Sequence, residues 1–175
     1  FLKPDSGTVV LDGRDITGQP PELNARAGMA RTFQIVQPFA AQTVRENIAV
    51  GAHLHEPRRA LALLAAEAVA ARVGLTGLLD KPAGDLTVAG RKRLELARTL
   101  ATQPRLLLLD EVLAGLNPQE IGEMIPVVRG IADSGITRPE QVPVAGVLVR
   151  FSAGMRAEST ALKRFLSHNL YRHPK

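Results

Sequence analysis

Hydrophobic and polar residues follow patterns along this 175-residue chain that predict both helices and strands. Residues 58–73 are mostly alanine, leucine and valine at helical spacing, and Gly74 follows them as a helix-ending residue. Residues 86–105 place their apolar side chains on one helical face. By contrast, residues 106–109 are four consecutive leucines, which is typical of a strand buried on both faces in the middle of a parallel sheet. The pattern therefore predicts an α/β chain.

Turn and capping residues define the shorter elements. The dipeptide Asp12-Gly13 separates Thr8–Leu11 from Arg14–Ile16, which predicts a β-hairpin with a tight turn. A short helix is predicted over residues 20–26, and a strand over residues 29–33. Longer helices are predicted to begin after three residues with capping side chains, which are Thr43, Thr87 and Asn117.

The composition excludes several classes of protein. There is no cysteine, so neither a disulfide framework nor a thiolate metal site is available, which fits a reducing cytosol. The longest run rich in alanine and leucine, residues 60–71, contains Glu67 and is shorter than the ~20 apolar residues that a membrane span needs. His53 and His55 have no other metal-ligating residue nearby in the sequence, and we expect them to be solvated.

The positive charge of the chain is concentrated near its carboxyl end. Residues 1–137 carry 15 Lys+Arg and 15 Asp+Glu, whereas residues 138–175 carry seven basic residues and two acids, which accounts for the whole net charge of +5. Within residues 86–105, Arg91, Lys92, Arg93 and Arg98 are interleaved with Glu95, so we expect a solvated helix face rather than a nucleic-acid surface.

Two acids follow the leucine strand directly. Asp110 and Glu111 stand where open α/β sheets bind their ligands, at the carboxyl end of a parallel strand. One interpretation makes Asp110 a magnesium ligand and Glu111 the base that orients a hydrolytic water. The other is a strand that simply ends in solvated charges. The strand alone does not separate these interpretations.

The flanking sequence favours the first interpretation. Residues 86–105 (LTVAGRKRLELARTLATQPR), the strand with its two acids, and the run Ala114-Gly115-Leu116-Asn117 before Pro118 resemble the signature helix, Walker B strand and D-loop of ABC ATPases, in that order and spacing. The runs RTFQ and TVRENIAVGAH, between residues 31 and 53, are similar to those of importers for branched-chain amino acids.

This resemblance implies a set of site residues. Glu111 would be the catalytic base, Asp110 would hold Mg²⁺, and Gln34 would be the Q-loop glutamine that contacts Mg²⁺ and the attacking water. The signature motif would be Leu86 followed by Thr87, Val88, Ala89 and Gly90, with Val88 and Ala89 in place of two glycines. These four residues and Asn117 of the D-loop would bind ATP, which a second ATPase subunit holds on its phosphate loop.

Both ends of the resemblance are incomplete within these 175 residues. No GxxxxGK[ST] phosphate loop occurs, so we expect the chain to begin within or just after the helix that follows that loop. The similarity stops near Thr137, and no histidine follows it until His168. Residues 138–175 are either an out-of-frame extension, which the change in charge favours, or a divergent carboxyl-terminal subdomain.

The prediction is therefore an α/β partial P-loop NTPase fold, an ABC nucleotide-binding domain without its phosphate-loop segment. Residues 1–137 would form the partial ATPase domain, residues 43–105 would include the helical subdomain and signature helix, and residues 138–175 would be a divergent basic tail. The implied function is ATP hydrolysis for import of branched-chain or related amino acids, with ATP and Mg²⁺ as cofactors, on the cytoplasmic face of the plasma membrane. The partners would be a second ATPase subunit and membrane-spanning permeases, with the periplasmic solute-binding protein only an indirect partner and nucleic acid none. The alternatives are a non-catalytic remnant that packs against an ATPase, and a tail that contacts membrane or RNA.

Overall fold

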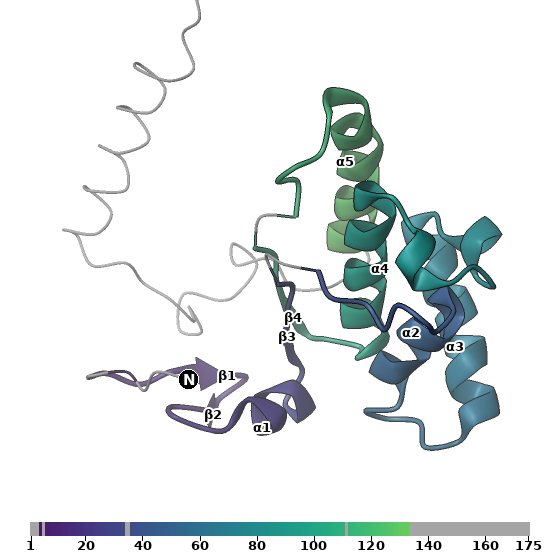
Figure 1. Ribbon diagram of the computed structural model, residues 1–175. Helices are drawn as coiled ribbons and strands as arrows, with labels where there is room; N and C mark the ends of the chain where they lie inside the picture. Colours follow the sequence, from purple (N-terminus) through teal and green to yellow (C-terminus); the bar gives the residue numbers. More distant parts are fainter. Residues whose placement is uncertain (1–3, 5, 34–35, 111, 134–175) are drawn as a thin grey trace, which may run out of the picture.

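The computed structural model of the 175-residue chain describes residue 4 and residues 6–33, 36–110 and 112–133. These residues form small β elements on one side of α4 (Val88–Ala101) and a helical part on the other (Figure 1). The remaining strands and α-helices in chain order are β1 (Val10–Leu11), β2 (Arg14–Asp15), α1 (Pro21–Arg26), β3 (Met29–Arg31), α2 (Val44–Ala52), α3 (Arg59–Val73), β4 (Leu106–Leu108) and α5 (Pro118–Asp133). Two short 3₁₀ helices, η1 (Thr76–Leu78) and η2 (Ala83–Asp85), lie between α3 and α4.

The predicted hairpin is present. Strands β1 and β2 pair antiparallel, with Leu11 opposite Arg14, so Asp12 and Gly13 alone form the turn. Both turn residues have positive φ, 50° and 77°, which is the left-handed conformation that a two-residue hairpin turn requires. Arg105 joins this turn to the chain before β4 through an ion pair of 2.8 Å with Asp12.

Strands β3 and β4 form a parallel pair that brings two distant parts of the sequence together. Met29 lies opposite Leu106 and Arg31 opposite Leu108, so the carboxyl ends of both strands lie at one edge. The prediction of a strand buried on both faces is wrong for its second half, because Leu108 and Leu109 are 42% and 41% exposed. Leu106 is buried, and β3 is the only strand that pairs with β4 within the described ranges.

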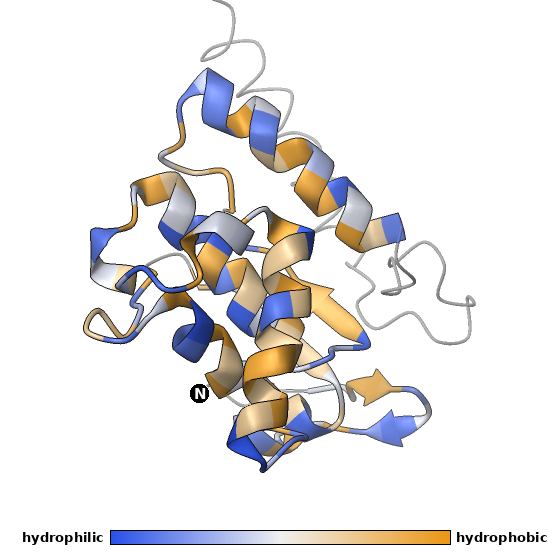
Figure 2. Cartoon of the chain, turned by 90° about the vertical axis from the view of Figure 1, so that its right-hand side faces the viewer, coloured by the Kyte–Doolittle hydropathy of each residue, from blue (hydrophilic) through white to orange (hydrophobic). Residues whose placement is uncertain are grey.

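The helical part is built from small side chains that permit close packing. Helix α3 buries Ala62, Ala66 and Ala70 completely, at a spacing of four residues that forms one stripe along the helix. This stripe packs against α2 and α4 in the main hydrophobic core, which also includes Met124 of α5. Figure 2 shows hydrophobic and hydrophilic residues alternating along the helices.

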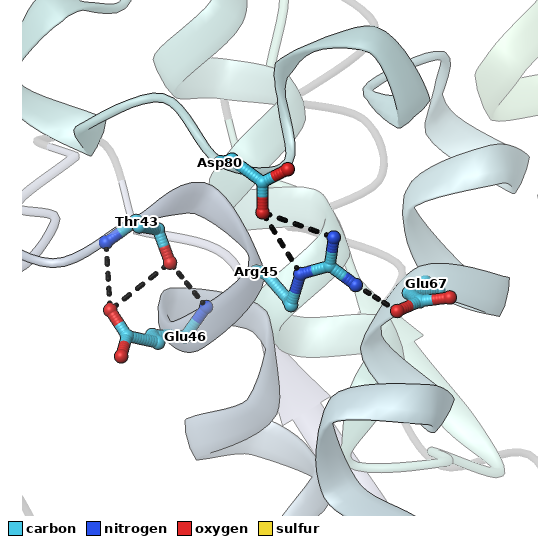
Figure 3. Close-up of polar contacts among 5 residues, drawn as sticks. All are labelled: Thr43, Arg45, Glu46, Glu67 and Asp80. Carbon is cyan, nitrogen blue, oxygen red and sulfur yellow. Dashed lines mark hydrogen bonds and ion pairs between the residues drawn. The ribbon is translucent and has the colours of Figure 1, made fainter.

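Residues 40–45 and 79–84 run alongside each other and close the helical part into one unit. The Val44 N–H donates to the Lys81 carbonyl, the Arg45 N–H to the Leu79 carbonyl and the Ala83 N–H to the Gln42 carbonyl, each at 2.9 Å. The guanidinium of Arg45 adds an ion pair with Asp80 at 3.0 Å and one with Glu67 of α3 (Figure 3). Arg45 therefore links three segments that are far apart in the sequence.

The predicted helix boundaries are confirmed by the capping contacts. Thr43 and Glu46 form a reciprocal capping box at the start of α2, as shown in Figure 3. Asn117 and Glu120 form the same reciprocal pair at the start of α5, with both bonds at 2.9 Å. Gly74 ends α3 in a left-handed conformation, at φ 72°.

One prediction about the surface is wrong. Of the residues expected on a solvated face of α4, Lys92 and Glu95 are each only 8% exposed, and Arg98 is half-buried. Phe33 contacts Glu95, and Gln37 and Phe39 contact Arg98, which sequence spacing along α4 cannot reveal. Residues 34, 111 and 138–175, on which other predictions depend, lie outside the described residues. None of the described helices is both long enough and apolar enough to cross a lipid bilayer.

Candidate active site

The acid that follows β4 is held by the strand beside it. The Asp110 N–H donates to the Thr32 hydroxyl at 3.0 Å, and the Thr32 N–H donates to the Leu108 carbonyl at 3.0 Å. These two bonds continue the pairing of β3 and β4 beyond the strands themselves. As a result, Asp110 and the chain after Thr32 lie at the same edge of the sheet.

The carboxylate of Asp110 has a cationic partner. Arg31 donates from Nη2 to Asp110 Oδ2 at 2.7 Å, and both side chains are about half exposed. No described residue bonds to the other oxygen, Oδ1, which leaves it open to solvent or a ligand. Sequence reasoning missed Arg31 and Thr32. Their position in RTFQ, on a strand predicted to run parallel to 106–109, was the available signal.

A second candidate element is the amino-terminal end of α4. Thr87 caps this helix, and its hydroxyl oxygen accepts the Gly90 N–H at 3.1 Å. Val88 is 55% exposed and Ala89 is partly exposed, whereas Gly90 is buried. Of the four predicted signature residues, only Thr87, Val88 and Ala89 are therefore accessible to a phosphate at the helix dipole's positive end.

The side chain of Arg91 forms hydrogen bonds with the chain that leads into α4. Its Nε donates to the Leu86 carbonyl and its Nη2 to the Gly84 carbonyl, both at 3.1 Å. The Gly84 N–H in turn donates to the Ala40 carbonyl at 3.0 Å. The start of α4 is thus connected through the main chain to residues that follow Gln34.

Replacing Thr87 with alanine should lower the free energy of unfolding by about 1 kcal/mol, because the Gly90 N–H would lose its acceptor. Urea unfolding followed by circular dichroism measures this difference. Thr87→Ser retains the hydroxyl and should unfold close to the parent chain. Equal destabilisation by serine and alanine would contradict the role of the hydroxyl as a cap.

The face of α4 that contacts Phe33, Gln37 and Phe39 carries the ionisable groups of Glu95 and Arg98. Glu95 accepts the Phe33 N–H, and burial raises the pKa of its carboxyl, although this hydrogen bond and then Lys92 and Arg98 oppose the increase. Arg98 donates to the Gln37 carbonyl at 3.1 Å, and burial lowers the pKa of its guanidinium. Neither the contact of Glu95 with Phe33 nor that of Arg98 with Gln37 was predicted from the sequence.

Comparison with known proteins identifies the family of the chain. A family model described as ABC transporter matches residues 1–114. The chain belongs to the ABC transporter family. Among curated members, the branched-chain amino acid transport ATP-binding proteins BraF of Pseudomonas aeruginosa and LivG of Escherichia coli are 39% and 40% identical to this chain. Each match covers 71% of this chain and 54% of the relative, so the chain spans about half the length of these relatives.

Solved structures of the family have the same fold. An ATP-binding cassette of an ABC transporter, MJ1267, matches with a TM-score of 0.68 at 30% identity, covering 78% of this chain and 59% of that one. A nucleotide-free ATP-binding cassette matches with a TM-score of 0.69 over 99% of this chain and 79% of that one, at 23% identity, which is evidence of fold alone. The predicted family and fold class are thereby confirmed.

Asp110 and the start of α4 offer groups of a type that can bind magnesium and phosphate. Mg²⁺ typically binds one or two carboxylates and completes its shell with water and substrate phosphates. The half-exposed Asp110 fits such a position, and no cluster of three or more acidic or histidine side chains in the described ranges forms a self-contained metal cage. The accessible N–H groups at the start of α4 suit a phosphate.

The structure does not bring all predicted ABC site residues together. Asp110 lies at the carboxyl end of β4, whereas Thr87 lies at the opposite end of α4 from the loop that enters β4 (Figure 1). Asn117 lies at the start of α5 and is exposed. No hydrogen bond or ion pair between described residues joins these three positions. In ABC ATPases, as the sequence resemblance implies, signature residues act on the nucleotide of a second subunit.

Proposed function

We propose that this chain belongs to the ATP-hydrolysing subunit of an ABC importer for branched-chain amino acids. The identity of 39–40% to BraF and LivG over 71% of the chain supports the proposal most directly. The positions of Asp110 and Thr87 at exposed ends of secondary structure are consistent with it. This similarity favours a transport subunit over a remnant that only packs against an ATPase.

Within this proposal each site residue has one role. Asp110 would hold Mg²⁺, Glu111 would accept the proton of the attacking water, and Gln34 would contact the metal and the water. Bound Mg²⁺ supplies charge neutralisation on the phosphoryl oxygens during transfer. Thr87 would offer its hydroxyl proton, and Val88 and Ala89 their N–H groups, to the terminal phosphate of ATP held by a second subunit. Gly90 would provide only the capping N–H, and Asn117 would shape the D-loop.

Arg31 occupies one oxygen of Asp110, so a metal would bind at the open Oδ1 or compete with Arg31 for Oδ2. Its guanidinium neutralises the carboxylate at 2.7 Å when no other cation is present. Because the pair is half exposed, water screens it, and a divalent cation with a bound nucleotide would compete effectively for the same oxygens. The partners of the complex would be a second ATPase subunit and permease subunits, at the cytoplasmic face of the membrane.

The signature half of the proposed site can be tested by association with a complete relative. We expect this chain to co-elute with LivG of Escherichia coli in gel filtration when ATP and Mg²⁺ are present. Val88→Asp should weaken the association at least tenfold, because its carboxylate would repel the phosphate. An acid in the first turn stabilises a helix, so this variant should remain folded.

The matched control is Val50→Asp. Val50 is a comparably exposed valine on α2, 43% against 55%, and lies away from the start of α4. This control should associate as the parent chain does. Absence of any ATP-dependent association, or equal loss with both variants, would contradict the proposed function.

Because the 175 residues contain no phosphate loop, the chain by itself should show no magnesium-dependent ATPase activity. Magnesium-dependent ATPase activity of the purified chain that Glu111→Gln abolishes would contradict this prediction.

A further inference from the structure

The chain that leaves β3 passes from the sheet to the helical part within two residues. Thr32 is still held by β4, because its N–H donates to the Leu108 carbonyl at 3.0 Å and its hydroxyl accepts the Asp110 N–H. Phe33 is held instead by Glu95 of α4. Residues 36–39 form neither helix nor strand, and side chains of α2 and α4 contact Gln37 and Phe39 there.

Glu95 supplies the acceptor that the Phe33 N–H would otherwise lack. The side chain of Phe33 is 63% exposed and contributes little packing, so this hydrogen bond is the main described constraint on that residue. Glu95 itself is only 8% exposed, and Lys92 on the same helix is equally buried. A buried carboxylate costs free energy unless it is hydrogen-bonded, which indicates that the contact is specific.

Arg98 holds the chain on the other side of residues 34–35. Its Nη1 donates to the Gln37 carbonyl at 3.1 Å, and its guanidinium lies 4.9 Å from the centre of the Phe39 ring. Glu95 and Arg98 are three residues apart, so they share one face of α4. Two side chains of a single helix therefore hold the chain before residue 34, at Phe33, and after residue 35, at Gln37.

We propose that Glu95 and Arg98 are positioning residues, which couple the main chain on both sides of Gln34 to the signature helix. Thr87 and Glu95 are eight residues apart on one continuous helix, a distance of about 12 Å. A displacement of the start of α4 is therefore transmitted to Phe33 and Gln37 rather than absorbed in the loop. This inference rests on the proposed function for its importance to hydrolysis, although the coupling itself requires no nucleotide.

Amide hydrogen exchange of the ¹⁵N-labelled 175-residue chain, measured by NMR, tests the coupling. Glu95→Ala should accelerate exchange of the Phe33 amide about tenfold, because one hydrogen bond to a charged acceptor is lost. The Thr32 amide, held by Leu108, should be unchanged. Glu95→Gln keeps an acceptor oxygen and should restore the protection to within about twofold to threefold of the parent chain.

Glu123→Ala is the matched control, since Glu123 is an exposed acid on α5 that pairs with Arg93 of α4 at 2.9 Å. It should leave the Phe33 amide unchanged. Unchanged Phe33 exchange in Glu95→Ala would overturn the proposal, as would uniform acceleration that includes Thr32 and the α4 amides. Equal effects of the alanine and glutamine variants would also overturn it. No nucleotide is present in this experiment, so its failure is distinct from failure of the association assay.

Discussion

Gly51→Ala should destabilise this chain by about 2 kcal/mol, even though alanine is the better helix former. A methyl group at position 51 of α2 would lie 2.2 Å from the Arg98 carbonyl oxygen and 3.0 Å from the Ala101 side chain. The carbonyl belongs to the backbone of α4, so the two helices must separate. Overpacking of this kind costs about 3 kcal/mol, and the gain in helix propensity offsets about 1 kcal/mol. Urea unfolding measures the difference.

Gly122→Ala is the control for helix propensity alone. Gly122 is an exposed residue of α5, and an added methyl group there has no neighbour within 4 Å. This substitution should stabilise the chain by about 0.5–1 kcal/mol. If both substitutions were stabilising, the close approach of α2 and α4 at Gly51 would be disproved.

Asn47→Ala should destabilise the chain by about 2–4 kcal/mol. Asn47 is completely buried in α2, where its Oδ1 accepts the Phe39 N–H at 2.9 Å. Its Nδ2 donates to the carbonyls of Phe39, Thr43 and Gln42, at 3.1, 2.9 and 3.4 Å. Alanine would leave the part-buried Phe39 N–H without its acceptor, whereas each of the three carbonyls keeps a main-chain donor. The orphaned donor costs about 1–3 kcal/mol, and the lost Nδ2 hydrogen bonds cost about 1 kcal/mol more.

Asn24→Ala provides a comparison at an asparagine with a different environment. Asn24 Oδ1 is buried but has no hydrogen-bond partner among the described residues. Its removal should therefore change the free energy of unfolding by no more than about 0.5 kcal/mol, since no hydrogen bond at that oxygen is lost. A comparable loss of stability in both variants would contradict the role of Asn47 as the anchor of residues 39–43.

Local signals in the sequence were sufficient to predict where α2, α4 and α5 begin. Thr43, Thr87 and Asn117 all cap helices in the structure, because a cap depends on residues within one turn of itself. The turn at Asp12-Gly13 and the end of α3 at Gly74 depend on backbone conformations that those residues favour. The family resemblance is likewise confirmed, since it rests on contiguous motifs.

Contacts between distant segments were not predictable in the same way. Glu95 was assigned to a solvated face because its neighbours along α4 are charged, yet its partner is Phe33, 62 residues away. Arg31 reaches Asp110 across 79 residues through strand pairing. The roles of Gln34 and Glu111 in catalysis stay predictions, as do those of Asp110 and the signature residues, because their proposed ligands come from other molecules.

The alignment of residues 40–45 with residues 79–84 has a consequence for how the chain acquires its structure. It joins the two ends of a segment of about forty residues, within which α2 and α3 already lie next to each other in sequence. Forming this pairing costs the loop-closure entropy of that one segment. Helix α4 begins shortly after residue 84, so it can join the unit without the closure of a second long loop. Parallel pairing of β3 with β4 bridges a longer stretch that includes the whole helical unit. The helical unit should therefore fold first, and the edge that carries Asp110 should assemble on it afterwards.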